Sequence, residues 1–132
     1  MFIVEYDPVA GIVRCTTGGF FSITDAQEQM KQLRGALDRC HREFRCVGML
    51  VFGVNATVQS PEVVANAKAN AWYYSSRDRM AIVVPSALAR MQGARFYTSP
   101  QEKIFAAEDE AMAWLTAELS RERQSTPQAR YG

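Results

Sequence analysis

The segment VGMLVFGVNATVQSPE, Val47 to Glu62, decides how this chain is expected to fold. Its first eight residues are apolar apart from two glycines, and they lack the alternation of a strand that has one wet face. Strands of this kind are buried on both sides, as in a parallel sheet. Ser60 and Pro61 then suit the cap and the first turn of a helix. The segment therefore predicts a buried strand, a loop and a helix, and open α/β sheets bind their ligands at the carboxyl ends of such strands.

An antiparallel hairpin is predicted before this strand. Residues 2–6 alternate between the two faces of a strand, and residues 12–17 are β-branched and half polar. Asp7 and Pro8 open a turn between them, and Gly11 closes it. We expect the hairpin to lie at one edge of the sheet.

A long amphipathic helix is predicted between the hairpin and the buried strand. Ser22 or Thr24 is expected to cap it, and Thr24 with Gln27 matches a capping box. Its apolar residues recur at steps of four and three and form one stripe that suits packing on a sheet: Ala26, Met30, Leu33, Leu37, Cys40 and Phe44. Gly35 lies opposite the stripe, where it weakens the helix by about 1 kcal/mol relative to alanine.

Helices and strands alternate after the loop. The expected elements are a helix from Pro61 to about Ser75, a strand at Met80–Val84, a short helix from Pro85 with Leu88 and Met91, a strand at Lys103–Ala106, and a last helix from Glu108 to Arg123. The order ββαβαβαβα predicts an α/β domain with a mostly parallel five-stranded sheet, because right-handed crossovers join the later strands. We expect one domain over residues 1–123 and a flexible tail over residues 124–132.

Composition narrows the function classes. The chain has 132 residues, of which 48% are hydrophobic, and fifteen basic and fourteen acidic residues give a formal charge of +1. This balance argues against wholesale binding of nucleic acid, which needs a basic surplus. No run approaches the roughly 20 apolar residues of a membrane span, and Glu5 and Asp7 interrupt any signal peptide. Three widely spaced cysteines fit a reduced compartment, so we expect a cytoplasmic protein.

Two stretches resemble a known family. They are RDRMAIVVPSALARMQGARFY, from Arg77, and KIFAAEDEAMAWL, from Lys103. Together with the predicted order of elements, they resemble the bacterial STAS-like, or anti-sigma factor antagonist-like, family over residues 1 to about 120. This fold is shared with the lipid-binding domain of Sec14-like proteins. The resemblance implies a compact βα domain that binds proteins or small ligands and catalyses no reaction.

The resemblance also draws attention to Ser60 as a possible phosphosite. In the phosphoswitch members, a serine at the start of the helix after the third strand is phosphorylated by a partner kinase. The family pattern there has an aspartate, two serines, a glycine and a leucine, whereas residues 55–62 are NATVQSPE. Only Ser60 falls near the right place, and Glu62 would repel a phosphate at the helix start. A helix cap is therefore the simpler role for Ser60.

The helix predicted after the loop is apolar on two sides. One side suits the core, and Ala65, Ala69 and Trp72 lie on nearly the opposite side. This second side needs a cover, which could be a helix of the same domain, a twin subunit, a partner protein or an apolar ligand. The predicted ligand or partner surface, with the loops before it, comprises Phe20, Phe21, Asn55, Thr57, Ser60, Ala65, Ala69, Trp72 and Tyr73.

Catalytic and metal-binding groups are scarce. His41 is the one histidine, and its neighbour Cys40 points about 100° away from it on the predicted helix. We therefore expect no catalytic residue, no metal site and no cofactor. An enzyme would need a site dispersed over distant residues, for which Arg77, Asp78 and Glu62 are the first candidates.

A basic flank of the first helix offers one further surface. It consists of Lys31, Arg34, Arg42 and Arg45, with Asp38 among them. Such a flank either binds an anion or an acidic partner or is solvated and crossed by weak ion pairs.

The expected function is non-catalytic. We expect a STAS-like regulatory domain that recognises a protein partner and can form a homodimer through residues 61–75. The alternative is a carrier or sensor of a small apolar or lipid-like ligand, held between that helix and the loops after the second and third strands.

Overall fold

The structure is a computed structural model that describes residues 2–18, 23–54, 76–94 and 99–124. Five strands form one sheet: β1 (Phe2–Asp7), β2 (Ile12–Gly18), β3 (Gly48–Val54), β4 (Arg79–Val83) and β5 (Glu102–Phe105). The helices are α1 (Ile23–Glu43), α3 (Ala87–Gly93) and α4 (Glu108–Gln124). The predicted α/β class is confirmed. The helix predicted over residues 61–75 lies outside the described residues. The tail was predicted over residues 124–132, but Gln124 ends α4, and residues 125–132 lie outside the described part.

The sheet has the order β1-β2-β3-β4-β5 and is mixed. β1 and β2 are antiparallel, with Phe2 opposite Thr17 and Asp7 opposite Ile12, and every later pair is parallel. Asp7 shapes the hairpin turn because its Oδ1 accepts hydrogen bonds from the amides of Val9 and Ala10 at 2.9 and 3.2 Å. Gly11 completes the turn with a φ of 68°, a conformation that favours glycine. The predicted edge hairpin and parallel strands are therefore confirmed.

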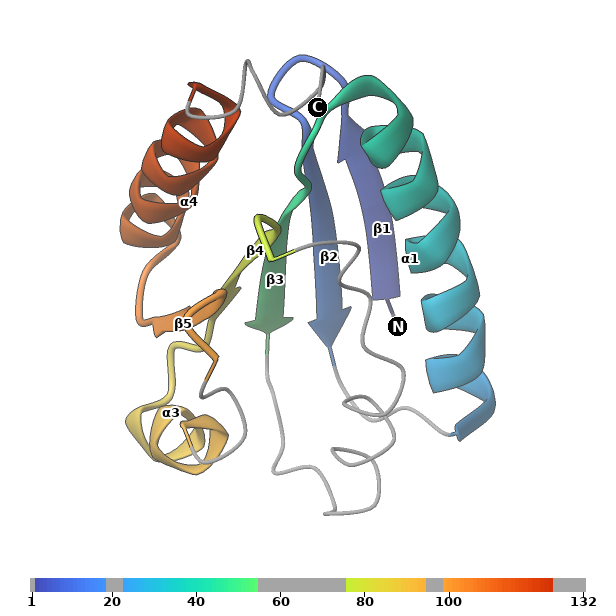
Figure 1. The fold of residues 1–132 in the computed structure, drawn as a ribbon. Coiled ribbons are helices and arrows are strands. Elements are labelled where there is room, and N and C mark those ends of the chain that lie inside the picture. The colour runs from blue at the N-terminus through green and yellow to red at the C-terminus, as the bar shows by residue number, and fades with distance from the viewer. Residues whose placement is uncertain (1, 19–22, 55–75, 95–98, 125–132) are drawn as a thin grey trace.

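The two long helices cover opposite faces of the sheet (Figure 1). α1 contacts β1 and β2, whereas α4 contacts β3, β4 and β5. Alternate residues of each strand point to opposite faces, so the core has two parts. Leu50 and Ala81 belong to the part under α4, and Met49 and Ile82 to the part under α1. A strand buried in this way on both sides has no wet face, which explains the unbroken apolar run of β3.

The apolar stripe of α1 packs as its spacing predicts. Leu33, Leu37 and Cys40 are buried in the core part that also contains Val13 of β2 and Met49 of β3, and Gly35 is exposed on the other side of the helix. The helix begins at Ile23, so Thr24 lies in its first turn rather than at the cap position.

Gly48 allows α4 to lie close to the sheet. A Cβ atom at this position would collide with the side chain of Leu119, which is itself buried. The packing of Leu119 therefore explains why the first residue of β3 is a glycine. None of the helices in the described part of the chain is long and apolar enough to cross a membrane.

Candidate functional site

The loops predicted to carry part of the partner surface follow β2 and β3 in the sequence. Gly18 and Val54, the last residues of these strands, are partners in the parallel register. The chain therefore leaves the sheet at neighbouring points on one edge, the carboxyl edge of β2–β4, as the sequence predicts for the two loops. The nine residues of the predicted surface lie outside the described ranges: Phe20, Phe21, Asn55, Thr57, Ser60, Ala65, Ala69, Trp72 and Tyr73.

An exposed apolar surface on α3 lies at the same edge. Leu88 is 62% exposed and Met91 is 70% exposed, and they stand three residues apart, on one side of the helix. We call these two residues the α3 patch. The short helix was predicted from the sequence, but its surface role was missed, because leucine and methionine at helical spacing are typical of core residues. The feature of the sequence that could have indicated this exposure is the shortness of the helix, because a short helix can bury few side chains.

The α3 patch stands on a well-anchored turn. Val84 continues the strand pairing, since its amide donates to the carbonyl of Phe105 at 2.9 Å. Ser86 caps the helix through a hydrogen bond from the amide of Ala89 to its Oγ at 3.3 Å. Arg90 closes the turn by donating from Nη1 to the carbonyls of Val84 and Pro85 at 2.9 and 2.7 Å. α3 is thereby held against the edge strand β5 with its two large apolar side chains in solvent.

The opposite, amino edge of the sheet holds the buried charges. Asp78 is fully buried, and its Oδ1 accepts a hydrogen bond from the amide of Val47 at 2.8 Å. The amide of Arg79 donates to the carbonyl of Val47 at 3.0 Å, so β4 begins at Arg79, one residue earlier than the sequence indicated. Gln101 adds a bond from Nε2 to the carbonyl of Asp78 at 3.0 Å. Asp78, a candidate for a dispersed active site, thus joins the starts of β3, β4 and β5.

Arg79 ties the same edge to α4. Its Nε lies 3.1 Å from an oxygen of Glu118, and its Nη2 lies 2.7 Å from an oxygen of Glu122. The side chains of all three residues are at most 20% exposed. Nη1 donates to the carbonyls of Ser76 and Asp78 at 2.8 and 3.0 Å. This guanidinium makes four hydrogen bonds, two to carboxylates of α4 and two to carbonyls, so it holds α4 on the sheet.

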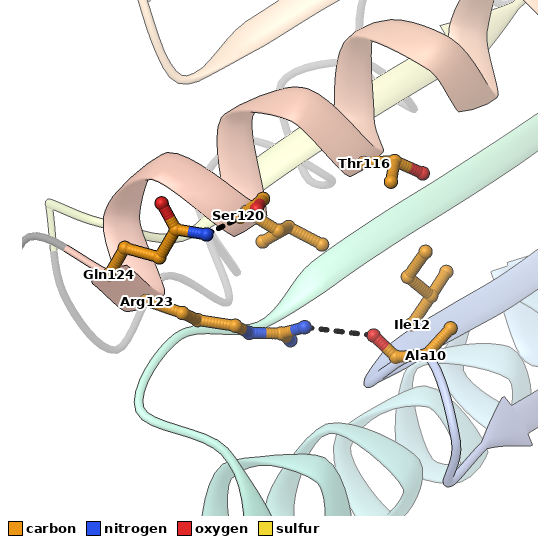
Figure 2. A pocket seen from close by; sticks show the side chains of 7 residues that line it. Ala10, Ile12, Thr116, Ser120, Arg123 and Gln124 are labelled. Carbon is orange, nitrogen blue, oxygen red and sulfur yellow. Dashed lines mark hydrogen bonds between the residues drawn. The ribbon is translucent and has the colours of Figure 1, made fainter.

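A pocket of about 330 Å³ opens where α4 ends beside the hairpin turn (Figure 2). Arg123 crosses it and donates to the carbonyls of Ala10, Gly11 and Cys46 at 2.9, 3.0 and 3.1 Å. The guanidinium also stacks on the ring of Phe44 at 4.4 Å. The sequence indicated only that Arg123 suits the helix dipole. Its tertiary role is to satisfy carbonyls from two loops.

The three cysteines are buried and free, as the sequence predicts for reduced thiols. Burial raises the pKa of Cys40 to about 11, and it also raises the pKa of Cys15 and of Cys46. Gln29 donates to the sulfur of Cys15 at 3.0 Å. Thiols of raised pKa stay protonated near neutral pH, so these side chains are poor nucleophiles.

His41 is exposed in the last turn of α1, on the helix that buries Cys40. Among residues 2–18, 23–54, 76–94 and 99–124, no three histidine, cysteine or acidic side chains are grouped to hold a metal ion.

A second hollow, of about 370 Å³, lies between α1 and the edge strand β1. It is lined by Val4, Tyr6, Gln32, Gly35, Ala36 and Arg39. The guanidinium of Arg39 lies 5.3 Å from the centre of the Tyr6 ring. Burial, with the carboxylate of Glu43 nearby, raises the pKa of Tyr6 to about 12, so the hydroxyl stays neutral.

Comparison with known proteins gives no relative. No protein-family model, no curated protein and no solved structure matches the chain.

Proposed function

We propose that this chain is a non-catalytic, cytoplasmic bacterial domain of the STAS-like kind that binds a protein partner through the carboxyl edge of its sheet. The observation that carries the proposal is the α3 patch, where Leu88 and Met91 are 62% and 70% exposed. Large apolar side chains that stand together in solvent on an anchored helix mark sites of protein contact.

The chemistry of α3 also favours one kind of partner. The helix ALARMQG carries Arg90 in its last turn and no acidic residue. An apolar segment flanked by acidic side chains would therefore complement both the apolar side chains and the positive charge of α3. The aliphatic and thioether side chains of the patch suit an apolar helix face, since methionine adapts its shape to what it meets.

The contacts of three polar side chains that are buried or half-buried support a binding role rather than catalysis. Asp78, Arg79 and Arg123 each join separate elements through short contacts. A catalytic group needs a geometry that is free to meet a substrate, whereas these three side chains are held by the domain's own backbone and carboxylates.

The test compares three forms of the full chain, captured from cells of the native host with bound proteins identified by mass spectrometry. They are the wild type, a Leu88→Glu/Met91→Glu variant, and a Val9→Glu control. Val9 is 90% exposed in the hairpin turn, away from α3, so the control has the same chemistry at another place. Because all three substitutions are at exposed positions, circular dichroism and the urea midpoint should be unchanged.

We expect one partner to bind the wild type and the Val9→Glu control with equal affinity and the α3 variant at least about tenfold more weakly. Titration of the purified partner against each form measures this directly. Equal binding to all three forms would refute the α3 surface. Native mass spectrometry that finds an apolar small molecule on the purified chain, and no protein partner, would replace this function with the ligand carrier.

A further inference from the structure

The exposed glycine in the middle of α1 has no explanation within the described chain. Gly35 is the thirteenth of the 21 residues of α1, and an added Cβ would meet nothing within 4 Å. Glycine is a poorer helix former than alanine, and nothing near it in the structure requires a missing side chain. Close approach by another backbone is one physical reason for a glycine at an exposed helix centre.

A charged stripe runs through this glycine along the outer side of α1. Its members recur at steps of four, three, four and three: Glu28, Gln32, Gly35, Arg39 and Arg42. All five are exposed. Gln32, Gly35 and Arg39 also border the hollow of about 370 Å³ beside β1. Figure 1 shows α1 at the outer side of the sheet, with none of the labelled elements beyond it.

We propose that this face binds a second copy of the chain, with the two α1 helices antiparallel and Gly35 of each copy at the two-fold axis. The stripe is complementary to itself in this arrangement. Glu28 of one copy meets Arg42 of the other, and Gln32 meets Arg39. Gly35 then faces Gly35 of the second copy, where the missing side chains let the two backbones come close. A symmetric interface of this kind makes every contact twice.

The order of charges selects the second copy and its direction. In a parallel pair, Glu28 would face Glu28 and Arg42 would face Arg42, which is repulsive. The antiparallel pair also opposes the two helix dipoles favourably. The hollow beside Val4 and Tyr6 has room for a long polar side chain of the second copy. This surface is distinct from the α3 patch, so a dimer would present two copies of the patch.

Analytical ultracentrifugation of the full chain tests the proposal. We expect a monomer–dimer equilibrium between about 1 μM and about 1 mM protein. The dimer should weaken between about 0.1 M and about 1 M salt, because the Debye length falls from ~10 Å to ~3 Å. Glu28→Arg alone and Arg42→Glu alone should each weaken the dimer about tenfold, since each places like charges together at two sites.

The decisive form carries both substitutions. Glu28→Arg with Arg42→Glu restores opposite charges at the two sites, so the affinity of the wild type should return. Gly35→Gln should abolish the dimer even though glutamine is the better helix former. Arg34→Glu is the matched control, because Arg34 is exposed on α1 but is not one of the five residues of the stripe, and this change should leave the dimer intact.

A chain that stays monomeric over this concentration range would overturn the proposal. So would a dimer that keeps its affinity in both single reversals, or one that is not rescued when they are combined. The titrations of the α3 variant with its partner are separate, so either idea can fail while the other survives.

Discussion

Replacement of Asp78 tests the hydrogen bond that joins the start of β3 to the start of β4. Asp78 is fully buried and its Oδ1 lies 2.8 Å from the amide of Val47, which is also fully buried. In Asp78→Ala, this N–H loses its acceptor at a place where bulk water has no access. In Asp78→Asn, the amide oxygen of the new side chain can still accept this bond, whereas the charge is lost.

The structure sets the size of each effect. A hydrogen bond to a charged group contributes about 1.5–3 kcal/mol, and a buried donor left without a partner costs about 1–3 kcal/mol. The two values describe largely the same loss and are not added, so we expect Asp78→Ala to lower the free energy of unfolding by about 3 kcal/mol. Asp78→Asn should lower it by about 1 kcal/mol. For a domain of this size, the alanine variant should melt roughly 10 °C lower than the wild type.

Urea unfolding followed by circular dichroism measures both variants. The slope of the free energy against urea should stay constant, since the surface exposed on unfolding does not change. Equal losses for alanine and asparagine would show that the charge of Asp78, not its bond to Val47, stabilises the domain. A loss below about 1 kcal/mol for alanine would refute the bond itself.

Three further predictions concern other parts of the molecule. Arg79→Met should lower the free energy of unfolding by about 2 kcal/mol, less than the roughly 3–5 kcal/mol of a fully buried pair, because Glu118 and Glu122 keep up to 20% exposure. In a double-mutant cycle with Glu122→Gln, a coupling energy of zero would contradict the ion pair. Burial raises the pKa of Cys40 from 9.0 to about 11, so the thiol of the unfolded chain loses its proton at lower pH than the thiol of the folded chain. The free energy of unfolding should therefore fall as the pH rises from about 9 to about 11. A Cys40→Ala variant whose free energy of unfolding falls equally steeply over this pH range would count against this. Gly35→Ala should stabilise the monomer by about 1 kcal/mol, measured by urea unfolding at low concentration, because the added methyl group meets open space.

The architecture follows from local patterns that the sequence displays directly. The apolar run at Val47–Val54 corresponds to the central strand β3, and the alternation at residues 2–6 corresponds to the edge strand β1. The stripe containing Leu33, Leu37 and Cys40 corresponds to the buried side of α1. These features depend on the period of a helix or strand, which a few neighbouring residues define.

The candidate surfaces were predicted less well, for a physical reason. Leu88 and Met91 have the spacing of core residues, and only the packing of α3 at the sheet edge leaves them in solvent. Exposure depends on what else covers a side chain, and this is a property of the whole fold. The nine residues of the predicted partner surface lie outside the part of the chain that the structure describes, so that surface remains a prediction.

The charged residues separate what the sequence alone predicts from what only the tertiary structure decides. From the sequence alone, Asp78 and Arg79 are two polar residues before an apolar strand, and Arg123 is a basic residue suited to a helix end. Tertiary structure decided that Asp78 binds the amide of Val47, that Arg79 binds two carboxylates of α4, and that Arg123 binds carbonyls up to 113 positions away. Periodicity is local and is therefore written in the sequence. The partner of a buried charge comes from a distant segment, and only the folded chain brings the two together.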